Sequence, residues 1–247
     1  MINVKDRFYD NTKEISFLNH LNDRDDTFWQ ALNYLAVFNE EKFTEENIYF
    51  HHARYFITSR LINHIMASYQ MLKMGLEDES LIMLRQALEL SWLLKYFIKN
   101  PFKAKNWVIK KKLKITPLER RIATDNNSTS GRIYAELSNI VHSNSNSIWG
   151  SCIGGMYNSW ISDKLFGQLV ILINNVFEYF EEIVLLFDIS ISNHELIKMK
   201  EEATNNIGYA IYETSYLLDS ESTINKLKEL GEDDVIRYLE ESYEIIE

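Results

Sequence analysis

The sequence predicts an all-α fold, a helical bundle of long antiparallel helices with a small C-terminal helical subdomain. Only 8 glycines and 2 prolines occur among 247 residues, and hydrophobic residues make up 46% of the chain. So few helix-breaking residues favour long helices over the many turns of a β architecture. The single cysteine, Cys152, excludes an internal disulfide. We therefore expect the fold to rest on helix packing, for which the apolar content is sufficient.

The pattern divides the chain into three parts. Residues 1–44 predict one or two modest N-terminal helices, and Asp25 or Asp26 is a candidate cap for the second. Residues 45–187 predict the main helical bundle, and residues 188–247 predict an acidic helical subdomain.

The helices of the main bundle are predicted where apolar residues recur with helical period and caps flank the segment. Gly75 ends the helix at residues 45–74. Asn100 ends the helix at residues 80–99, because the residue before a proline disfavours helical geometry. The short link between these two predicts an antiparallel hairpin. The helix predicted at residues 163–187 is almost wholly apolar and should lie at the centre of the bundle. The segments are residues 45–74, 80–99, 132–142 and 163–187.

Further helices are predicted outside these segments. Residues 102–113 form a basic helix in which Trp107 and Val108 supply the apolar contacts. In the C-terminal part, residues 192–195 fit a capping box that opens a helix reaching to about residue 218.

The charge is unevenly distributed, although the chain as a whole carries a net charge of −10. Residues 95–132 hold eleven basic and two acidic side chains, a local charge of +9, whereas residues 188–247 hold fifteen acidic and five basic ones. Such segments either solvate the fold and attract one another or mark an anion-binding patch on an acidic protein. On the second interpretation, the nucleic-acid-binding residues would be Lys105, Lys110, Lys111, Lys112, Lys114, Arg120 and Arg121.

Polar side chains gather on one face of the predicted helix at residues 132–142. Tyr134, Ser138 and His142 are spaced at i, i+4 and i+8, and Asn139 lies beside His142. About fifty residues earlier, Arg85 and Glu89 stand at i and i+4 in a helix that is apolar nearly all round.

We expect the Arg85 and Glu89 pair to be mostly buried and to need further partners, for which His142 and Tyr134 are the candidates. If each member is satisfied, the set is a buried polar network that fixes how the helices cross. The alternatives are an enzyme site and a ligand-binding or RNA-binding pocket without turnover.

Several kinds of site have no signature in the sequence. The chain lacks Glu-x-x-His, His-Glu-x-x-His and the glycine-rich phosphate-binding loop, so di-metal, metalloprotease and nucleoside-triphosphate chemistry are not indicated. His51, His52 and His64 form a weak metal-binding candidate, because adjacent side chains point about 100° apart on a helix. We expect no metal and no cofactor.

The Arg85-x-x-x-Glu89 turn and the Leu137-Ser-x-x-Val-His142 segment together resemble HEPN-like helical domains, over about residues 50–187. The likeness is greatest to an uncharacterised bacterial branch with both motifs. The resemblance implies a role in RNA-linked systems such as phage defence or toxin–antitoxin pairs. In nuclease members it also implies a homodimer whose cleft cuts RNA without metal, using an Arg and a His that are separated by four to six intervening residues.

The sequence departs from that nuclease pattern at the arginine. The corresponding positions before His142 are Ala135, Glu136 and Leu137, and Arg132 lies ten residues away on a different face. Cleavage by 2′-hydroxyl attack needs a base and a cation that stabilises the phosphorane charge. His142 can serve as the base, and Arg85 could supply the cation from the neighbouring helix.

The sequence also favours a cytoplasmic location. The N-terminus is charged where a signal peptide would be apolar, and no uninterrupted run of about 20 apolar residues occurs, so we expect no membrane segment. Besides RNA, a partner protein is a candidate ligand, through the acidic C-terminal helices.

Overall fold

The structure, a computed structural model, describes residues 22–41, 47–109, 159–189, 194–214 and 228. Every regular element within these residues is an α-helix, which confirms the all-α prediction. The helices are α2 (Asn22–Glu40), α3 (Ile48–Lys73), α4 (Glu77–Lys99), α5 (Pro101–Val108), α8 (Ser159–Leu186) and α9 (His194–Thr214). The helix predicted at residues 132–142 lies outside the described residues.

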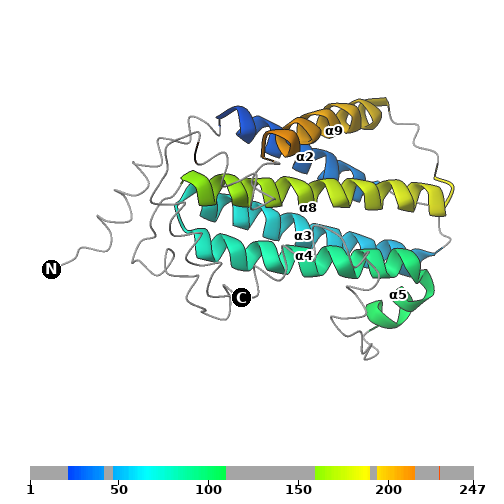
Figure 1. The fold of residues 1–247 in the computed structure, drawn as a ribbon. Helices are drawn as coiled ribbons and strands as arrows, with labels where there is room; N and C mark the ends of the chain where they lie inside the picture. Colours follow the sequence, from blue (N-terminus) through cyan, green and yellow to red (C-terminus); the bar gives the residue numbers. More distant parts are fainter. Residues whose placement is uncertain (1–21, 42–46, 110–158, 190–193, 215–227, 229–247) are drawn as a thin grey trace.

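The helices form a layered bundle around α8 (Figure 1). The antiparallel hairpin of α3 and α4 lies along one side of α8 and has the most extensive helix–helix interface, as its short connection predicts. On the other side, α2 and α9 lie next to each other, and α9 also packs on α8. The short α5 turns back from the end of α4 and packs against α3.

The hairpin turn follows the predicted chemistry. Gly75 has φ 71°, in the left-handed region where glycine is favoured, and it ends α3 as expected. Helix α4 begins at Glu77, three residues before the predicted start, because Glu77, Asp78 and Glu79 occupy a first turn that favours acidic side chains. Asn100 ends α4 directly before Pro101, which is the first residue of α5.

Other predicted boundaries also need correction. Helix α2 is described from Asn22, so Asp25 and Asp26 lie within it and do not precede it as caps. Helix α3 starts at Ile48 and not at residue 45. Helix α5 ends at Val108, five residues before the predicted end, and the residues from 110 onward lie outside the described part of the chain.

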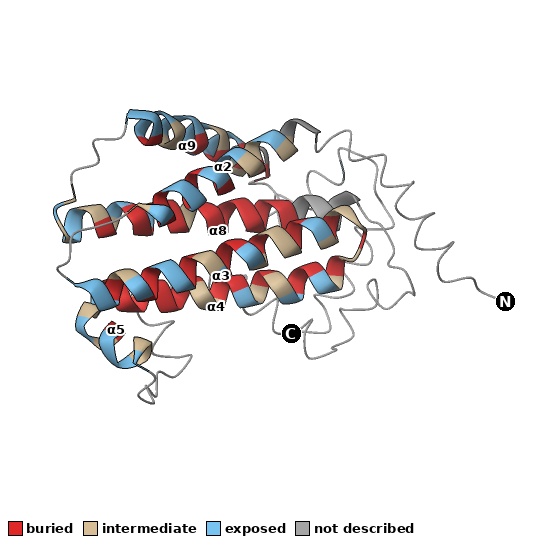
Figure 2. Cartoon of the chain, turned by 180° about the vertical axis from the view of Figure 1, so that it is seen from behind, coloured by how far each residue is buried: buried red, intermediate tan, exposed pale blue. Residues whose placement is uncertain are grey.

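Aromatic rings join the layers of the core. Phe38 of α2 stacks on Phe180 of α8 with ring centroids 4.1 Å apart, and Tyr34 meets Phe177 edge-on at 5.0 Å. Buried residues line the facing sides of α3, α4 and α8 (Figure 2). Between Leu165 and Ile173, α8 is buried all round, which confirms its predicted central position.

The contact between α8 and α9 depends on a glycine. A side chain added at Gly167 would place its Cβ 2.9 Å from Oγ1 of Thr214, at the end of α9. Thr214 is itself buried and bonds through that oxygen to the carbonyl of Ala210. A Cβ at this distance would force the Thr214 side chain or one of the two helices to shift, so the absence of a side chain at Gly167 allows α8 and α9 to approach this closely.

Candidate functional site

The predicted Arg85 and Glu89 pair exists, but it is only partly buried. Nε of Arg85 lies 3.4 Å from Oε1 of Glu89, and their side chains are 19% and 38% exposed. The expectation of a mostly buried pair was therefore wrong for Glu89. The physical reason is that α4 packs on α3 and α8 by the face carrying Leu84 and Leu88, and leaves an outer strip with Gln86 exposed.

The other predicted members of that network fall outside the described residues. They are Tyr134, Ser138, Asn139 and His142. The predicted contact between the Arg85 and Glu89 pair and this helix therefore stays a prediction.

Among the predicted nucleic-acid-binding residues, Lys105 is described, and it lies on an exposed corner of the molecule. Its ammonium group is 5.3 Å from the centre of the Tyr49 ring, which α3 supplies from its first turn. Phe102, one turn earlier on α5, is 74% exposed. We call Tyr49, Lys99, Phe102 and Lys105 the α5 corner. The remaining predicted residues, Lys110, Lys111, Lys112, Lys114, Arg120 and Arg121, lie outside the described residues.

The lysines around this corner differ in how they are bound. Lys95 forms an ion pair with Glu182 and lies 4.8 Å from the Tyr179 ring centre. Lys103 donates a hydrogen bond of 2.7 Å to the Tyr96 hydroxyl. Lys99 and Lys105 are exposed. The lysines of α4 and α5 thus include two that fasten the fold and two that face solvent.

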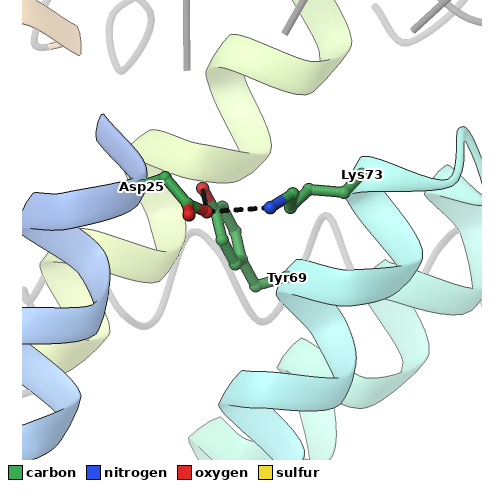
Figure 3. Close-up of polar contacts among 3 residues, drawn as sticks. All are labelled: Asp25, Tyr69 and Lys73. Atoms are coloured by element: carbon green, nitrogen blue, oxygen red, sulfur yellow. Dashed lines mark hydrogen bonds and ion pairs between the residues drawn. The ribbon is translucent and has the colours of Figure 1, made fainter. Parts of the chain in front are cut away.

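A polar cluster that the sequence did not predict ties α2 to the end of α3 (Figure 3). Oδ1 of Asp25 accepts hydrogen bonds from the Tyr69 hydroxyl and from the Lys73 ammonium group, each 2.9 Å long. Tyr69 is fully buried and stacks on Phe28 with ring centroids 3.8 Å apart. Asp25, proposed from the sequence as a helix cap, is therefore a clamp between two helices.

Protonation in this cluster follows from its contacts. Burial favours a higher pKa for Asp25, but the hydrogen bonds from Lys73 and Tyr69 and the Lys73 charge outweigh it, so its pKa is lowered. Burial, followed by the hydrogen bond to Asp25 and its negative charge, raises the pKa of Tyr69. At neutral pH, Asp25 is a carboxylate and Tyr69 a phenol that donates to it, which makes a structural clamp and not a proton-transfer pair.

A second unpredicted group is Arg54, whose guanidinium caps the C-terminus of α2. Arg54 is 3% exposed. It donates to the carbonyls of Phe38 at 3.2 Å, Asn39 at 3.1 Å and Glu41 at 3.2 Å, and to the Asn39 side-chain oxygen at 3.4 Å. The last carbonyls of a helix have no partner within it, so Arg54 supplies their donors from α3.

The charge on Arg54 affects its neighbours. Burial lowers the pKa of Arg54 to about 10, while Glu40 and Glu41 raise it, so it remains a cation at neutral pH. Burial, followed by the Arg54 and His52 charges, lowers the pKa of His51 to about 4. His51 packs against the rings of Phe50 and Phe187, with centroid distances of 5.5 and 5.1 Å. It is a neutral imidazole in the fold at pH 7.

One sequence signal could have identified Arg54. It follows Phe50 by one turn and precedes Ile57 and Thr58, all of which are buried on the same face of α3. A charged residue within an apolar stripe needs acceptors when it is buried. The sequence does not say which carbonyls supply them, because those belong to α2.

Within the residues that the structure describes, no three His, Cys, Asp or Glu side chains gather closely enough to hold a metal ion. In the same part of the chain, no helix has the length and apolar character needed to cross a membrane.

Comparison of the chain with known proteins gave no matching family model, no similar curated protein and no similar solved structure.

Proposed function

We propose that this chain is an HEPN-like bacterial protein that binds RNA through the basic segment at residues 95–132, as an effector or regulator of a defence or toxin–antitoxin type system. The observation that most supports this proposal is the concentration of positive charge in one segment of an acidic chain. Residues 95–132 have a local charge of +9 within a chain of net charge −10. Lys99 and Lys105, at the start of this segment, are exposed. A local cationic surface of this kind supplies the phosphate contacts on which RNA affinity depends.

In this proposal, His142 and Arg85 are the residues that carry out any RNA cleavage. His142 would take the proton of the 2′-hydroxyl, and Arg85 would stabilise the developing negative charge. Tyr134, Ser138 and Asn139 would orient the imidazole. The partial exposure of Arg85 supports this assignment, because a fully buried guanidinium could not reach a phosphate. Glu89 competes for the same cation, so we expect slow turnover.

Salt dependence of RNA binding tests the proposal. Each phosphate contact to single-stranded RNA contributes a slope of about −0.7 to the logarithm of affinity against the logarithm of salt concentration. Lys105→Glu should weaken binding and reduce the slope by about that amount. Lys198→Glu is the matched control, because Lys198 is 70% exposed on α9, outside the basic segment.

Cleavage needs its own measurement. His142→Ala should abolish the formation of 2′,3′-cyclic phosphate ends while leaving RNA affinity and its salt slope unchanged. If the wild-type chain retains no RNA at low salt and forms no cyclic phosphate, the RNA-binding function is wrong.

A second candidate function is binding of a partner protein through the acidic C-terminal helices, with the Arg85, Glu89 and His142 set acting only as structure. It is favoured by the outer face of α9, where Tyr209 and Tyr212 are 65% and 77% exposed. Exposed tyrosines are common at protein interfaces. Tyr212→Ser should then weaken complex formation, or the homodimer that the HEPN-like resemblance implies, as measured by sedimentation.

A further inference from the structure

We propose that the α5 corner binds RNA as a single strand, by stacking an unpaired base on the Phe102 ring while Lys99 and Lys105 contact the adjoining phosphates. This inference rests on the proposed RNA-binding function and adds the class of RNA and the residue that selects it.

The first support is the orientation of α5. Its inner face carries Ala104, which is fully buried, with Trp107 and Val108 partly buried against the core. Its outer face carries Phe102 and Lys105, at i and i+3, and Ile109 follows directly after the last residue of the helix. Phe102 is 74% exposed and Ile109 is 40% exposed. Eight residues of helix therefore place an aromatic ring and a cation together on a surface that the bundle does not cover.

The second support is the neighbouring ring of α3. Tyr49 is 37% exposed and has the Lys105 ammonium group 5.3 Å from its ring centre. This cation–π contact holds Lys105 near the aromatic surface, in place of an acidic partner. Within the described residues Lys105 forms no ion pair with a carboxylate, so a phosphate that approaches it meets an available cation with a flat aromatic surface beside it.

The third support is charge complementarity. Residues 90–109 contain four lysines and no acidic residue. Lys95 is paired with Glu182, and Lys103 bonds to the Tyr96 hydroxyl, so Lys99 and Lys105 are the two that face solvent at this corner. A polyanion is the occupant that this balance favours.

The aromatic ring decides between single-stranded and duplex RNA. In a duplex the flat faces of the bases are stacked on one another, and only backbone and groove edges are accessible. In a single strand, a base can turn out and stack on an aromatic side chain, which contributes ~1–3 kcal/mol per base. Lysines alone would not distinguish the two forms, but an exposed Phe beside them does.

The test compares three probes of equal length by fluorescence anisotropy: an unstructured single strand of mixed sequence, its duplex, and an abasic strand that keeps the phosphates and lacks the bases. Phe102→Ala should lower affinity for the single strand by roughly 5- to 150-fold. It should leave affinity for the duplex and the abasic strand, and the salt slope, unchanged. Phe102→Trp should restore binding of the single strand.

Leu185→Ala is the control. Leu185 is an exposed apolar residue like Phe102, at 80%, but it lies on α8 and outside the α5 corner. This variant should bind all three probes as the wild type does. Thermal unfolding followed by circular dichroism should show the same transition for the Phe102→Ala, Phe102→Trp and wild-type chains, because the substituted ring is exposed.

The outcomes separate this inference from the proposed function. If the wild type binds no RNA, both are wrong. If it binds RNA and Phe102→Ala binds the single strand equally well, the stacking inference falls and the RNA-binding function stands. A uniform loss for all three probes would mean that Phe102 supports α5 and does not contact a base. If an acidic peptide displaces the single strand and its binding also depends on Phe102, the corner is a protein-binding surface.

Discussion

Two arginines of the α3 and α4 hairpin show opposite ways of placing a cation in a helical bundle. Arg54 of α3 is 3% exposed and donates to three carbonyls and an amide oxygen of the segment that ends α2. Arg85 of α4 has a 19% exposed side chain and pairs with Glu89 of its own helix. The Arg54 hydrogen bonds join two helices, whereas the ion pair between Arg85 and Glu89 lies within one helix.

This comparison shows that an i, i+4 ion-pair partner, which is visible in the sequence, is not what allows an arginine side chain to be buried. An i, i+4 ion pair is visible in the sequence and contributes only ~0.3–0.5 kcal/mol on a helix surface. A guanidinium can be buried when several fixed acceptors replace its water, and the unpaired carbonyls at a helix end are such acceptors. These acceptors become available to Arg54 only once α2 and α3 have packed.

The largest effect should come from Arg54→Met, which we expect to lower the free energy of unfolding by about 3 kcal/mol. Several carbonyls at the end of α2 would lose a buried donor, and each unsatisfied group costs ~1–3 kcal/mol. Urea unfolding measures this loss. Arg54→Lys should recover only part of it, because an ammonium group cannot reach the same set of acceptors as the planar guanidinium. A Met variant within ~0.5 kcal/mol of wild type would show that water can replace the arginine.

A smaller loss, about 1 kcal/mol, is expected for Tyr69→Phe, which removes one of the two donors to Asp25 but keeps the buried ring. The Asp25 carboxylate is a partly exposed acceptor. The Tyr69→Phe loss shows whether its contribution to the free energy of unfolding is closer to that of the buried Arg54 contacts or to that of the Glu89 ion pair. The Asp25 side chain is 31% exposed, so water can replace the hydroxyl in part. Urea unfolding of Tyr69→Phe, Asp25→Ala and the double variant gives the coupling energy. A coupling energy near zero would contradict the clamp.

Acid should weaken the fold through His51, which stands one turn before Arg54. The pKa of His51 is about 4 in the fold against an ordinary value of 6.5, so the folded protein holds the imidazole neutral. Its contribution is complete above pH 6.5 and is lost as the pH falls from 6.5 toward 4, because the unfolded chain then binds the proton more readily.

The variant that tests this is His51→Gln, compared with wild type by urea unfolding at pH 7 and pH 5. The difference between the two pH values should shrink in the variant. His64, whose pKa burial also lowers, adds a loss in the same direction, so His64→Gln is the control for the remainder. An unchanged difference in His51→Gln would show that His51 is solvated in the fold.

The smallest effect is expected at the ion pair, where Glu89→Ala should change the free energy of unfolding by less than ~0.5 kcal/mol. Burial of the whole pair would have predicted a loss of roughly 3–5 kcal/mol. A double-mutant cycle with Arg85→Met measures the pair directly. A loss above ~2 kcal/mol in Glu89→Ala would mean that Glu89 bonds to further groups of the fold.

The helices were predictable because their signals are local. Gly75, Pro101 and the apolar run of α8 act within a few residues, and the structure confirms each of them. The polar contacts were less accessible to this reasoning. Asp25 precedes Thr27 and Phe28 as a cap would, yet its partners Tyr69 and Lys73 lie 44 and 48 residues away. Which polar groups meet across helices depends on packing, and a residue pattern alone does not encode it.

The predicted Arg85 and Glu89 site also combines a local feature that the sequence predicted and a packing feature that it did not. Its ion pair was found because i and i+4 are neighbours on any helix. Its burial was misjudged because the apolar residues of α4 were counted without knowing which side faces α3 and α8. The predicted basic helix extended to residue 113, whereas α5 ends at Val108, because a run of lysines carries no signal for where a helix stops.

The Arg54 cap also bears on the order in which the bundle assembles. It joins groups 13 to 16 residues apart, whereas the Lys95 and Glu182 ion pair joins α4 to α8 across 87 residues. Closing the longer loop costs about 1.5 kcal/mol more in chain entropy, at ~0.6 kcal/mol for each doubling of length. The contact between the end of α2 and α3, like the α3 and α4 hairpin, can therefore form between segments that are close in the sequence. Docking of α8 is the step with the higher entropic barrier, and its rate should limit folding.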